Sequence, residues 1–186
     1  MSSEKGKNIK VIIICLLLGI VLEMLTLSVL KIVLSSFKDV ERAYSEDISG
    51  LLENSLSVIL YVVLISPILE EFIYRFAIMG LAKKYFGFLI ADLIQATLFG
   101  IYHGNVVQGI YAFALGMLIG YIKETTGSVV NCIVLHCAFN AAGLIVKDYV
   151  DFIPVPAMYI VALISLVASV YMIGTIHSQK CVQQSS

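Results

Sequence analysis

The stretch Leu64–Gly80, LISPILEEFIYRFAIMG, places two carboxylates and one guanidinium inside an otherwise apolar run. These three charges belong to Glu70, Glu71 and Arg75, and no other residue of the stretch is charged. An ionisable group inside a membrane costs about 2.5–3.5 kcal/mol on insertion scales, so such groups persist where they pair or carry function. The stretch therefore predicts a membrane helix that holds a polar site.

The composition of the whole chain agrees with a membrane protein. Of its 186 residues, 60% are hydrophobic and 13% are charged, and the mean hydropathy is +0.97. Soluble domains usually carry about 45–50% apolar and about 25% charged residues. We therefore expect a single all-α transmembrane domain over residues 1–186. The formal net charge of −1 argues against a nucleic-acid partner, whereas the sequence does not indicate an oligomeric state.

Six apolar segments approach the length of about 20 residues that crosses a bilayer as a helix. Polar breaks that contain Gly, Asn or Pro separate them, as expected for turns. The pattern predicts a polytopic helix bundle of about six transmembrane helices. The segments are residues 11–34, 54–82, 87–103, 105–122, 127–146 and 155–176.

The basic residues of the loops predict an orientation in the cell membrane. Lys and Arg are more frequent in cytoplasmic loops than in external ones. If the N-terminus is inside, the inner segments hold seven such residues and the outer segments hold four, which places both termini in the cytoplasm. The inner set is Lys5, Lys7, Lys10, Lys83, Lys84, Lys123 and Lys180, and the outer set is Lys31, Lys38, Arg42 and Lys147.

The two adjacent carboxylates differ in their expected helical neighbours. Glu71 and Arg75 are four residues apart with the acid on the N-terminal side, which is the favourable order for an ion pair along a helix. Glu70 has Tyr74 at the same spacing and no sequence-local counter-charge. This pattern is typical of a general acid or base beside a structural carboxylate. A salt bridge that only packs helices is the alternative.

Two further segments add imidazole and amide groups. His103 ends the third segment, four residues after Phe99. His136 and Asn140 are four residues apart within the fifth segment, so together they can donate two hydrogen bonds to one oxyanion. Hydrogen bonding between helices, worth about 0.6 kcal/mol on average, is the alternative. With Glu70, these groups fit a water-activating site in the core of a bundle.

Three short motifs occur in order on these segments. EEFIYR at 70–75 matches E-E-x-x-x-R, FGIYH at 99–103 matches F-x-x-x-H, and HCAFN at 136–140 matches H-x-x-x-N. In this order they resemble the motifs of the CAAX-protease and bacteriocin-processing family, also called the Abi family, which includes the Ras-converting CAAX endopeptidase. The resemblance covers a motif-bearing core of about residues 54–145.

The resemblance implies an intramembrane glutamate-type endopeptidase with no cofactor. Its partners would be membrane lipid and a membrane-associated peptide or protein substrate. By the same resemblance Glu70 is the general base, His103 helps to hold the attacking water, and the other two catalytic residues stabilise the oxyanion. Those two residues are His136 and Asn140. The supporting residues are Glu71 and Arg75.

Three other functions remain open from the sequence. Glu70, His103 and His136 form a reasonable zinc ligand set for an intramembrane metallopeptidase, although no HExxH motif is present. Cys132 and His136 are also four residues apart and permit a thiol nucleophile, but buried cysteines are usually inert. Finally, the chain can be a bacteriocin immunity or scaffold protein that binds a membrane-active peptide without cutting it.

Three more residues of the apolar segments stand out. Asp92 is interpreted as a helix-start residue near the inner interface. Glu23 either hydrogen-bonds across the bundle or faces the site. Pro67 is expected to bend the second segment one turn before Glu70.

Overall fold

The computed structural model of the protein describes residues 2–51 and 56–184, and within these ranges it contains helices and no strand. The chain divides into two compact units. Unit 1 comprises Met1–Glu41 and Val134–Ser186, and unit 2 comprises Arg42–Ile133. The predicted all-α, polytopic membrane fold is confirmed. A single transmembrane domain over the whole chain stays a prediction.

All six predicted membrane segments contain helix within the described residues; residues 54 and 55 of the second predicted segment lie outside them. In the described part of the chain, five helices are long and apolar enough to cross a membrane, and a sixth apolar helix is shorter. The five long ones are Ile9–Leu34, Leu56–Ala82, Val106–Thr126, Val129–Lys147 and Val155–Gln179, and the shorter one is Phe88–Tyr102. The protein is therefore a multi-pass membrane protein, whereas the orientation of its termini stays a prediction.

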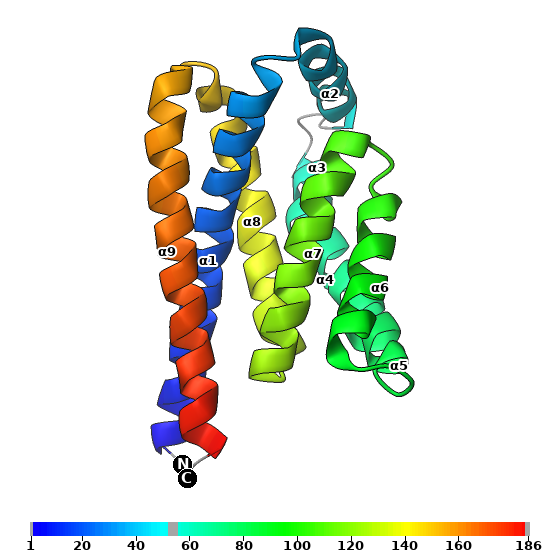
Figure 1. Ribbon diagram of the computed structural model, residues 1–186, viewed down its shortest axis with the longest axis vertical. Coiled ribbons are helices and arrows are strands. Elements are labelled where there is room, and N and C mark those ends of the chain that lie inside the picture. The colour runs from blue at the N-terminus through cyan, green and yellow to red at the C-terminus, as the bar shows by residue number, and fades with distance from the viewer. Residues whose placement is uncertain (1, 52–55, 185–186) are drawn as a thin grey trace. The chain divides into compact units, whose positions relative to one another are not determined.

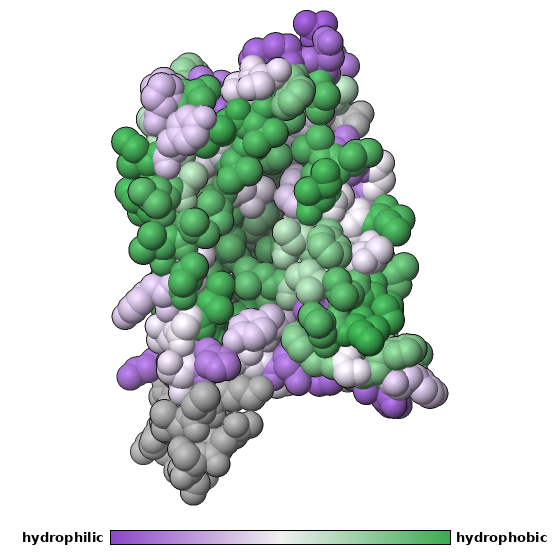
Figure 2. All heavy atoms as spheres, in the orientation of Figure 1, coloured by the Kyte–Doolittle hydropathy of each residue, from purple (hydrophilic) through white to green (hydrophobic). Residues whose placement is uncertain are grey.

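Unit 1 is built on the pairing of the first and last helices. Helix α1 (Ser2–Leu34) and helix α9 (Val155–Gln184) lie side by side, with the first turns of α1 and the last turns of α9 at the same end (Figure 1). Hydrophobic side chains gather along the middle of the visible face of α9 (Figure 2). This distribution is expected for a helix whose outer face meets lipid.

Helix α8 (Val129–Val150) enters unit 1 and is held against α1 at two points. The first is Gly19, where an added Cβ would overlap the carbonyl oxygen of Leu135. The second is Lys31, whose Nζ donates to the carbonyl oxygen of Val150 at 2.7 Å and lies 3.3 Å from Asp151 Oδ1. A cation at a helix C-terminus satisfies its last carbonyls and opposes the negative end of the helix dipole.

Unit 2 contains an interrupted second membrane segment. After helix α2 (Lys38–Leu51), the chain from residue 56 to residue 82 alternates between α-helical and π-helical turns. The pieces are α3 (Leu56–Leu60), the π-helix η1 (Tyr61–Ile65), α4 (Ser66–Glu71), the π-helix η2 (Phe72–Ile78) and α5 (Met79–Ala82). Glu70 and Glu71 thus occupy a short α-helical piece between two π-helical ones.

The π-helical turns are defined by their backbone hydrogen bonds. The N–H of Ser66 donates to the carbonyl of Tyr61, and the N–H of Met79 donates to that of Tyr74, both five residues back. Pro67 follows the first of these turns directly, and its ring would collide with the carbonyl four residues back in a regular α-helix. Single π turns are frequent at functional sites. The irregularity expected at Pro67 therefore takes the form of a widened turn.

The second segment turns its charges inward and its apolar residues outward. Glu70, Glu71 and Arg75 are buried, whereas Ile73 and Phe76 on the opposite face are 50% and 64% exposed. This is the reverse of a soluble amphipathic helix and fits one whose surrounding solvent is lipid. The burial pattern thus turns the charges of the first motif away from the exposed apolar face of the segment.

Helix α6 (Phe88–Tyr102) is short and packs along helix α7 (Val106–Thr126). The two helices touch at Gly100, where an added Cβ would lie 2.8 Å from the carbonyl oxygen of Gly109. They are joined by a tight turn in which Gly104 adopts φ +71° and the Asn105 side chain accepts from the N–H of Gln108. Such φ values favour glycine.

The length of α6 determines the depth of its last residue. Fifteen residues at about 1.5 Å per residue give about 22 Å, which is about 8 Å less than the hydrocarbon core of about 30 Å. In Figure 1, the upper end of α6 correspondingly lies below the upper end of α7, where α7 begins. A helix of this length that starts at one interface places His103, at its C-terminal end, below the opposite interface.

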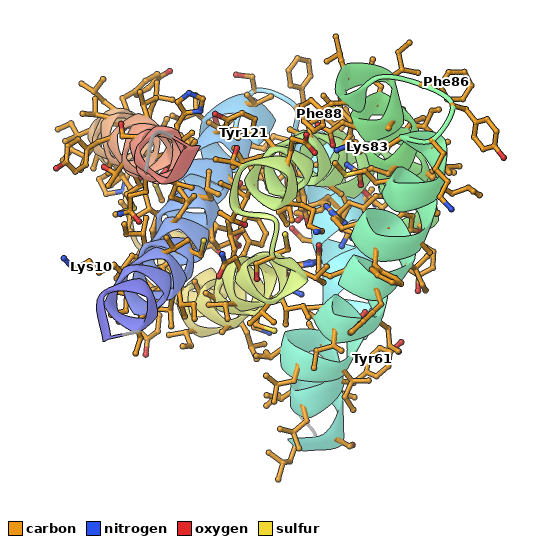
Figure 3. All side chains as sticks on the ribbon, turned by 90° about the horizontal axis from the view of Figure 1, so that it is seen from below. Lys10, Tyr61, Lys83, Phe86, Phe88 and Tyr121 are labelled. Carbon is orange, nitrogen blue, oxygen red and sulfur yellow. The ribbon has the colours of Figure 1, made fainter. Side chains whose placement is uncertain are left out.

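The start of α6 carries the features of a membrane interface. Lys83, Phe86 and Phe88 gather at the α5–α6 turn (Figure 3), where Figure 2 shows hydrophilic side chains beside the hydrophobic face. Lys83 also pairs with Glu124 at the far end of α7. Aromatic and basic residues are enriched at the level of lipid headgroups, so this turn marks one edge of the apolar layer.

The close contact at Gly19 generates a stability prediction. Gly19→Ala should lower the free energy of unfolding by about 1–3 kcal/mol, because the added methyl overpacks α1 against α8. The matched control is Gly174→Ala, where no atom lies within 4 Å of the added Cβ. Both changes carry the same gain in helix propensity of about 0.8–1 kcal/mol. Denaturant unfolding in bicelles checks the pair, and equal stability of the two variants would contradict the packing described.

Candidate active site

The first motif forms a fully buried ion pair. Arg75 Nε lies 3.1 Å from Glu71 Oε2, and both side chains are completely excluded from solvent. The i to i+4 pairing predicted from the sequence is therefore confirmed. In surroundings of low dielectric constant such a pair is strong only if further hydrogen bonds reach the remaining polar atoms.

Arg75 extends this pair to two other helices. Its Nη2 donates to the carbonyl oxygen of Gly116 on α7 at 3.4 Å, and its Cζ lies 4.5 Å from the ring centroid of Phe99 on α6. A guanidinium over an aromatic face gains a cation–π attraction, which is largest where water is excluded. One side chain thus connects Glu71 to both neighbouring helices.

The same Phe99 orients the histidine of the second motif. His103 Nδ1 lies 2.8 Å from the carbonyl oxygen of Phe99, and the two rings meet edge to face with centroids 4.7 Å apart. A carbonyl oxygen only accepts, so Nδ1 carries the hydrogen, and in a neutral imidazole Nε2 is then the acceptor. Through Phe99, the first and second motifs are in physical contact within unit 2.

Glu70 is buried, with 8% of its surface exposed, and accepts a hydrogen bond from the Ser66 hydroxyl. Its i+4 neighbour Tyr74 turns toward α6, where its ring packs edge to face on Phe99 at 5.1 Å. The sequence analysis missed Ser66, although its position one turn before Glu70 was a usable signal. The two carboxylates therefore differ in environment: a guanidinium accompanies Glu71, and a neutral hydroxyl accompanies Glu70.

The third motif lies on α8, in unit 1. His136 is 2% exposed and Asn140 is partly buried. The helix is continuous from Val129 to Val150, so the two side chains share one stripe, as the spacing predicts. One turn further, the carboxylate of Glu23 on α1 packs against Gly143. Convergence of this stripe with Glu70 and His103 stays a prediction.

The residues of the alternative mechanisms occupy distinct environments. The Cys132 thiol is completely buried, and its Sγ contacts the carbonyl oxygens of Ile119 and Ser128 at 3.6 and 3.4 Å. This is the environment of a packing cysteine rather than of an activated thiolate. Within the residues that the structure describes, no three His, Cys, Asp or Glu side chains form a group that can hold a metal ion.

The interpretation of Asp92 as a helix-start residue was wrong. Asp92 lies in the second turn of α6, 2% exposed, and accepts a hydrogen bond from Gln95 on the side that faces α7. The sequence could not show this, because the room for Asp92 is made by Gly120, which is 28 positions later and lies on another helix.

Comparison with known proteins relates the motif-bearing region to one family. Residues 52–142 match the family model described as type II CAAX prenyl endopeptidase Rce1-like, a range that contains all three motifs. The helical, multi-pass fold and this match support the class of intramembrane CAAX-type proteases. Within that class, the matched region, 91 of the 186 residues, is similar to the Rce1-like CAAX protease family. Searches among curated proteins and among solved structures found no significant match.

The buried ion pair generates the second stability prediction. Arg75→Ala should lower the free energy of unfolding by about 3–5 kcal/mol, because it leaves the Glu71 carboxylate buried without its cation. Arg75→Lys should recover only part of this, since an ammonium cannot serve Glu71, Gly116 and Phe99 together. Denaturant titration in bicelles measures both variants.

The control for this prediction is the exposed pair at the α5–α6 turn. Lys83→Ala removes a pair with Glu124 in which both side chains are about one-third exposed, and such pairs contribute about 0–1 kcal/mol. A loss no larger for Arg75→Ala than for Lys83→Ala would show that the buried pair does not stabilise the fold.

Proposed function

We propose that the protein is an intramembrane endopeptidase that hydrolyses peptide bonds of membrane-associated peptide or protein substrates with water activated by Glu70. The supporting observation is the difference between the two adjacent carboxylates. Glu71 is committed to Arg75, whereas Glu70 accepts from the neutral Ser66 hydroxyl. A carboxylate has about four lone-pair sites, so Glu70 can accept a hydrogen bond from water besides the one from Ser66. The family match supports the same reaction class.

In the proposed reaction, water is held between Glu70 and the Nε2 of His103. Its oxygen attacks the carbonyl carbon of the scissile peptide bond while Glu70 takes one of its protons. His136 and Asn140 donate hydrogen bonds to the oxyanion that forms. The C–N bond then breaks, and the proton held by Glu70 passes to the leaving amine. The products are a carboxylic acid, which loses its remaining proton to the amine or to water, and an amine, and no side chain is acylated.

The contacts of Arg75 and Phe99 support this arrangement. Glu71, Arg75 and Phe99 form a continuous series of contacts that ends at the His103 ring. Phe99 also fixes the tautomer of His103 that leaves Nε2 as the acceptor for water. Glu71 and Arg75 are thus supporting residues, and the proposed mechanism requires no cofactor.

The central test is Glu70→Gln, which keeps the shape of the side chain and removes the base. We expect turnover to fall by about 10²–10⁴-fold, with an unchanged unfolding midpoint. The measurement uses purified protein in liposomes and a panel of quenched peptides, each made with and without a C-terminal farnesyl group. Glu46→Gln, an exposed carboxylate on α2, is the matched control and should keep full turnover.

Three outcomes would contradict the glutamate mechanism. Turnover by Glu70→Gln equal to that of the unmodified protein excludes Glu70 as the base. Activity that disappears with EDTA and returns with zinc favours the metallopeptidase with Glu70, His103 and His136 as ligands. Cleavage of no panel peptide, together with a cellular phenotype that survives Glu70→Gln, favours an immunity or scaffold protein.

The oxyanion role is tested separately with Asn140→Ala. Loss of one oxyanion donor should lower kcat by about 10²–10³-fold and leave KM nearly unchanged, because the interaction forms only in the transition state. Asn131→Ala removes another buried amide of the same helix outside the motif, and its kcat should stay close to that of the unmodified protein. A raised KM with normal kcat in Asn140→Ala would assign Asn140 to substrate binding instead.

A further inference from the structure

Two polar residues of α6 lie outside the three motifs and are almost completely buried. Asp92 and Gln95 are 2% and 0% exposed and lie one turn apart. Gln95 Nε2 donates to Asp92 Oδ1 at 2.7 Å and to the carbonyl oxygen of Gly116 at 3.0 Å. A carboxylate in an apolar helix is expensive to insert into a membrane, so the pair calls for an explanation beyond packing.

The Gly116 carbonyl is where this pair meets the first motif. The same oxygen that accepts from Gln95 also accepts from Arg75 Nη2 at 3.4 Å. The helices approach closely enough because Gly116 lacks a side chain, and an added Cβ would lie 3.2 Å from Ala96. The contacts therefore run from Asp92 through Gln95 and Gly116 to the guanidinium that holds Glu71.

Asp92 determines which way the Gln95 amide points. An ionised carboxylate only accepts hydrogen bonds, so it selects the NH₂ end of the amide. Gln95 Oε1 is buried without a hydrogen-bond partner in the described part of the chain. Rotating the amide by half a turn would put its NH₂ group at this position instead, where it would lack a partner as well. If the amide turned round, its oxygen would face the Gly116 carbonyl and the bond between them would be lost.

A glycine makes the room that Asp92 needs. An added Cβ at Gly120 would overlap Asp92 Oδ1 and would lie 3.0 Å from Gln95 Nε2. Any side chain at this position therefore displaces the carboxylate from the amide. A substitution at Gly120 can therefore displace the Asp92 side chain while Asp92 and Gln95 themselves remain unchanged.

We propose that Asp92 and Gln95 are positioning residues of the proposed protease, acting through the Gly116 carbonyl on Arg75 and thereby on the Glu70–Glu71 segment. The inference rests on the proposed function. Arg75 is held from three sides, by Glu71, Phe99 and Gly116. A displaced Gly116 contact therefore shifts the Glu71 carboxylate and with it the short helix α4 that also carries Glu70. A displacement of about 1 Å at a catalytic group can lower the rate about 10²-fold.

The test compares two glycine substitutions with the panel peptide that the unmodified protein cleaves fastest. Gly120→Ala should lower kcat about 10²-fold with KM unchanged. Gly80→Ala, where no atom lies within 4 Å of the added Cβ, should change neither. Asp92→Asn keeps an acceptor for Gln95 and should recover most of the kcat that Asp92→Ala loses.

A double substitution separates positioning from general overpacking. If the methyl at 120 acts through Asp92, then Asp92→Ala/Gly120→Ala should be no slower than Asp92→Ala alone, because the truncated side chain leaves room. A second measurement, a double-mutant cycle on stability, does not depend on turnover. Gln95→Leu and Arg75→Ala should each lower the unfolding midpoint. The fall in the variant with both changes should be smaller than the sum of the two single falls, because both residues bond the Gly116 carbonyl.

The inference is overturned if Asp92→Ala, Gln95→Leu and Gly120→Ala keep the kcat of the unmodified protein while Glu70→Gln loses it. In that case the proposed function stands. Additive falls in unfolding midpoint, or kcat losses that disappear when rates are expressed per folded molecule, also overturn it. Full turnover by Glu70→Gln instead removes the proposed function, whatever the α6 variants do.

Discussion

A single guanidinium buried in apolar surroundings constrains the structure of unit 2 more than any other group described. Arg75 cannot lose its charge, so each of its contacts must be supplied by a residue of the right type at the right place. Glu71 supplies the counter-charge, Phe99 supplies an aromatic face, and Gly116 supplies a carbonyl at a position where an added Cβ would lie only 3.2 Å from Ala96. The approach of α6 to α7 follows from these needs.

The membrane reverses the usual relation between burial and polarity. In the second segment the charged residues face inward and large apolar ones, such as Phe76, face outward. Helices in lipid gain little from burying apolar surface against each other, so packing and polar contacts must hold them together. The glycines at which α6 and α7 approach each other provide the close packing, and the Arg75 contacts provide the polar interactions. The same residues that build the site thus also hold the helices that carry it.

Much of this could be predicted from local sequence. Apolar length gave the membrane helices, and the i to i+4 spacing gave the Glu71–Arg75 pair. The π-helical turns around α4 could not be predicted from local sequence. A π turn is rare in an isolated helix, and the tertiary contacts that stabilise it are not visible in the local pattern. The place of Asp92 was also beyond reach, since its neighbours Gly116 and Gly120 come from another helix. Predictions from local sequence thus fail at the polar site, and functional sites are where such predictions are expected to fail.

The shortness of α6 has a consequence for the surrounding bilayer. A helix about 8 Å shorter than the hydrocarbon core creates a hydrophobic mismatch, which lipids relieve by local thinning. Thinning beside the end of α6 brings the hydrated headgroups closer to His103, whereas the neighbouring α7 has 21 residues and is long enough to span the hydrocarbon core. For the proposed hydrolysis, this shortens the path of water from the bilayer surface to His103.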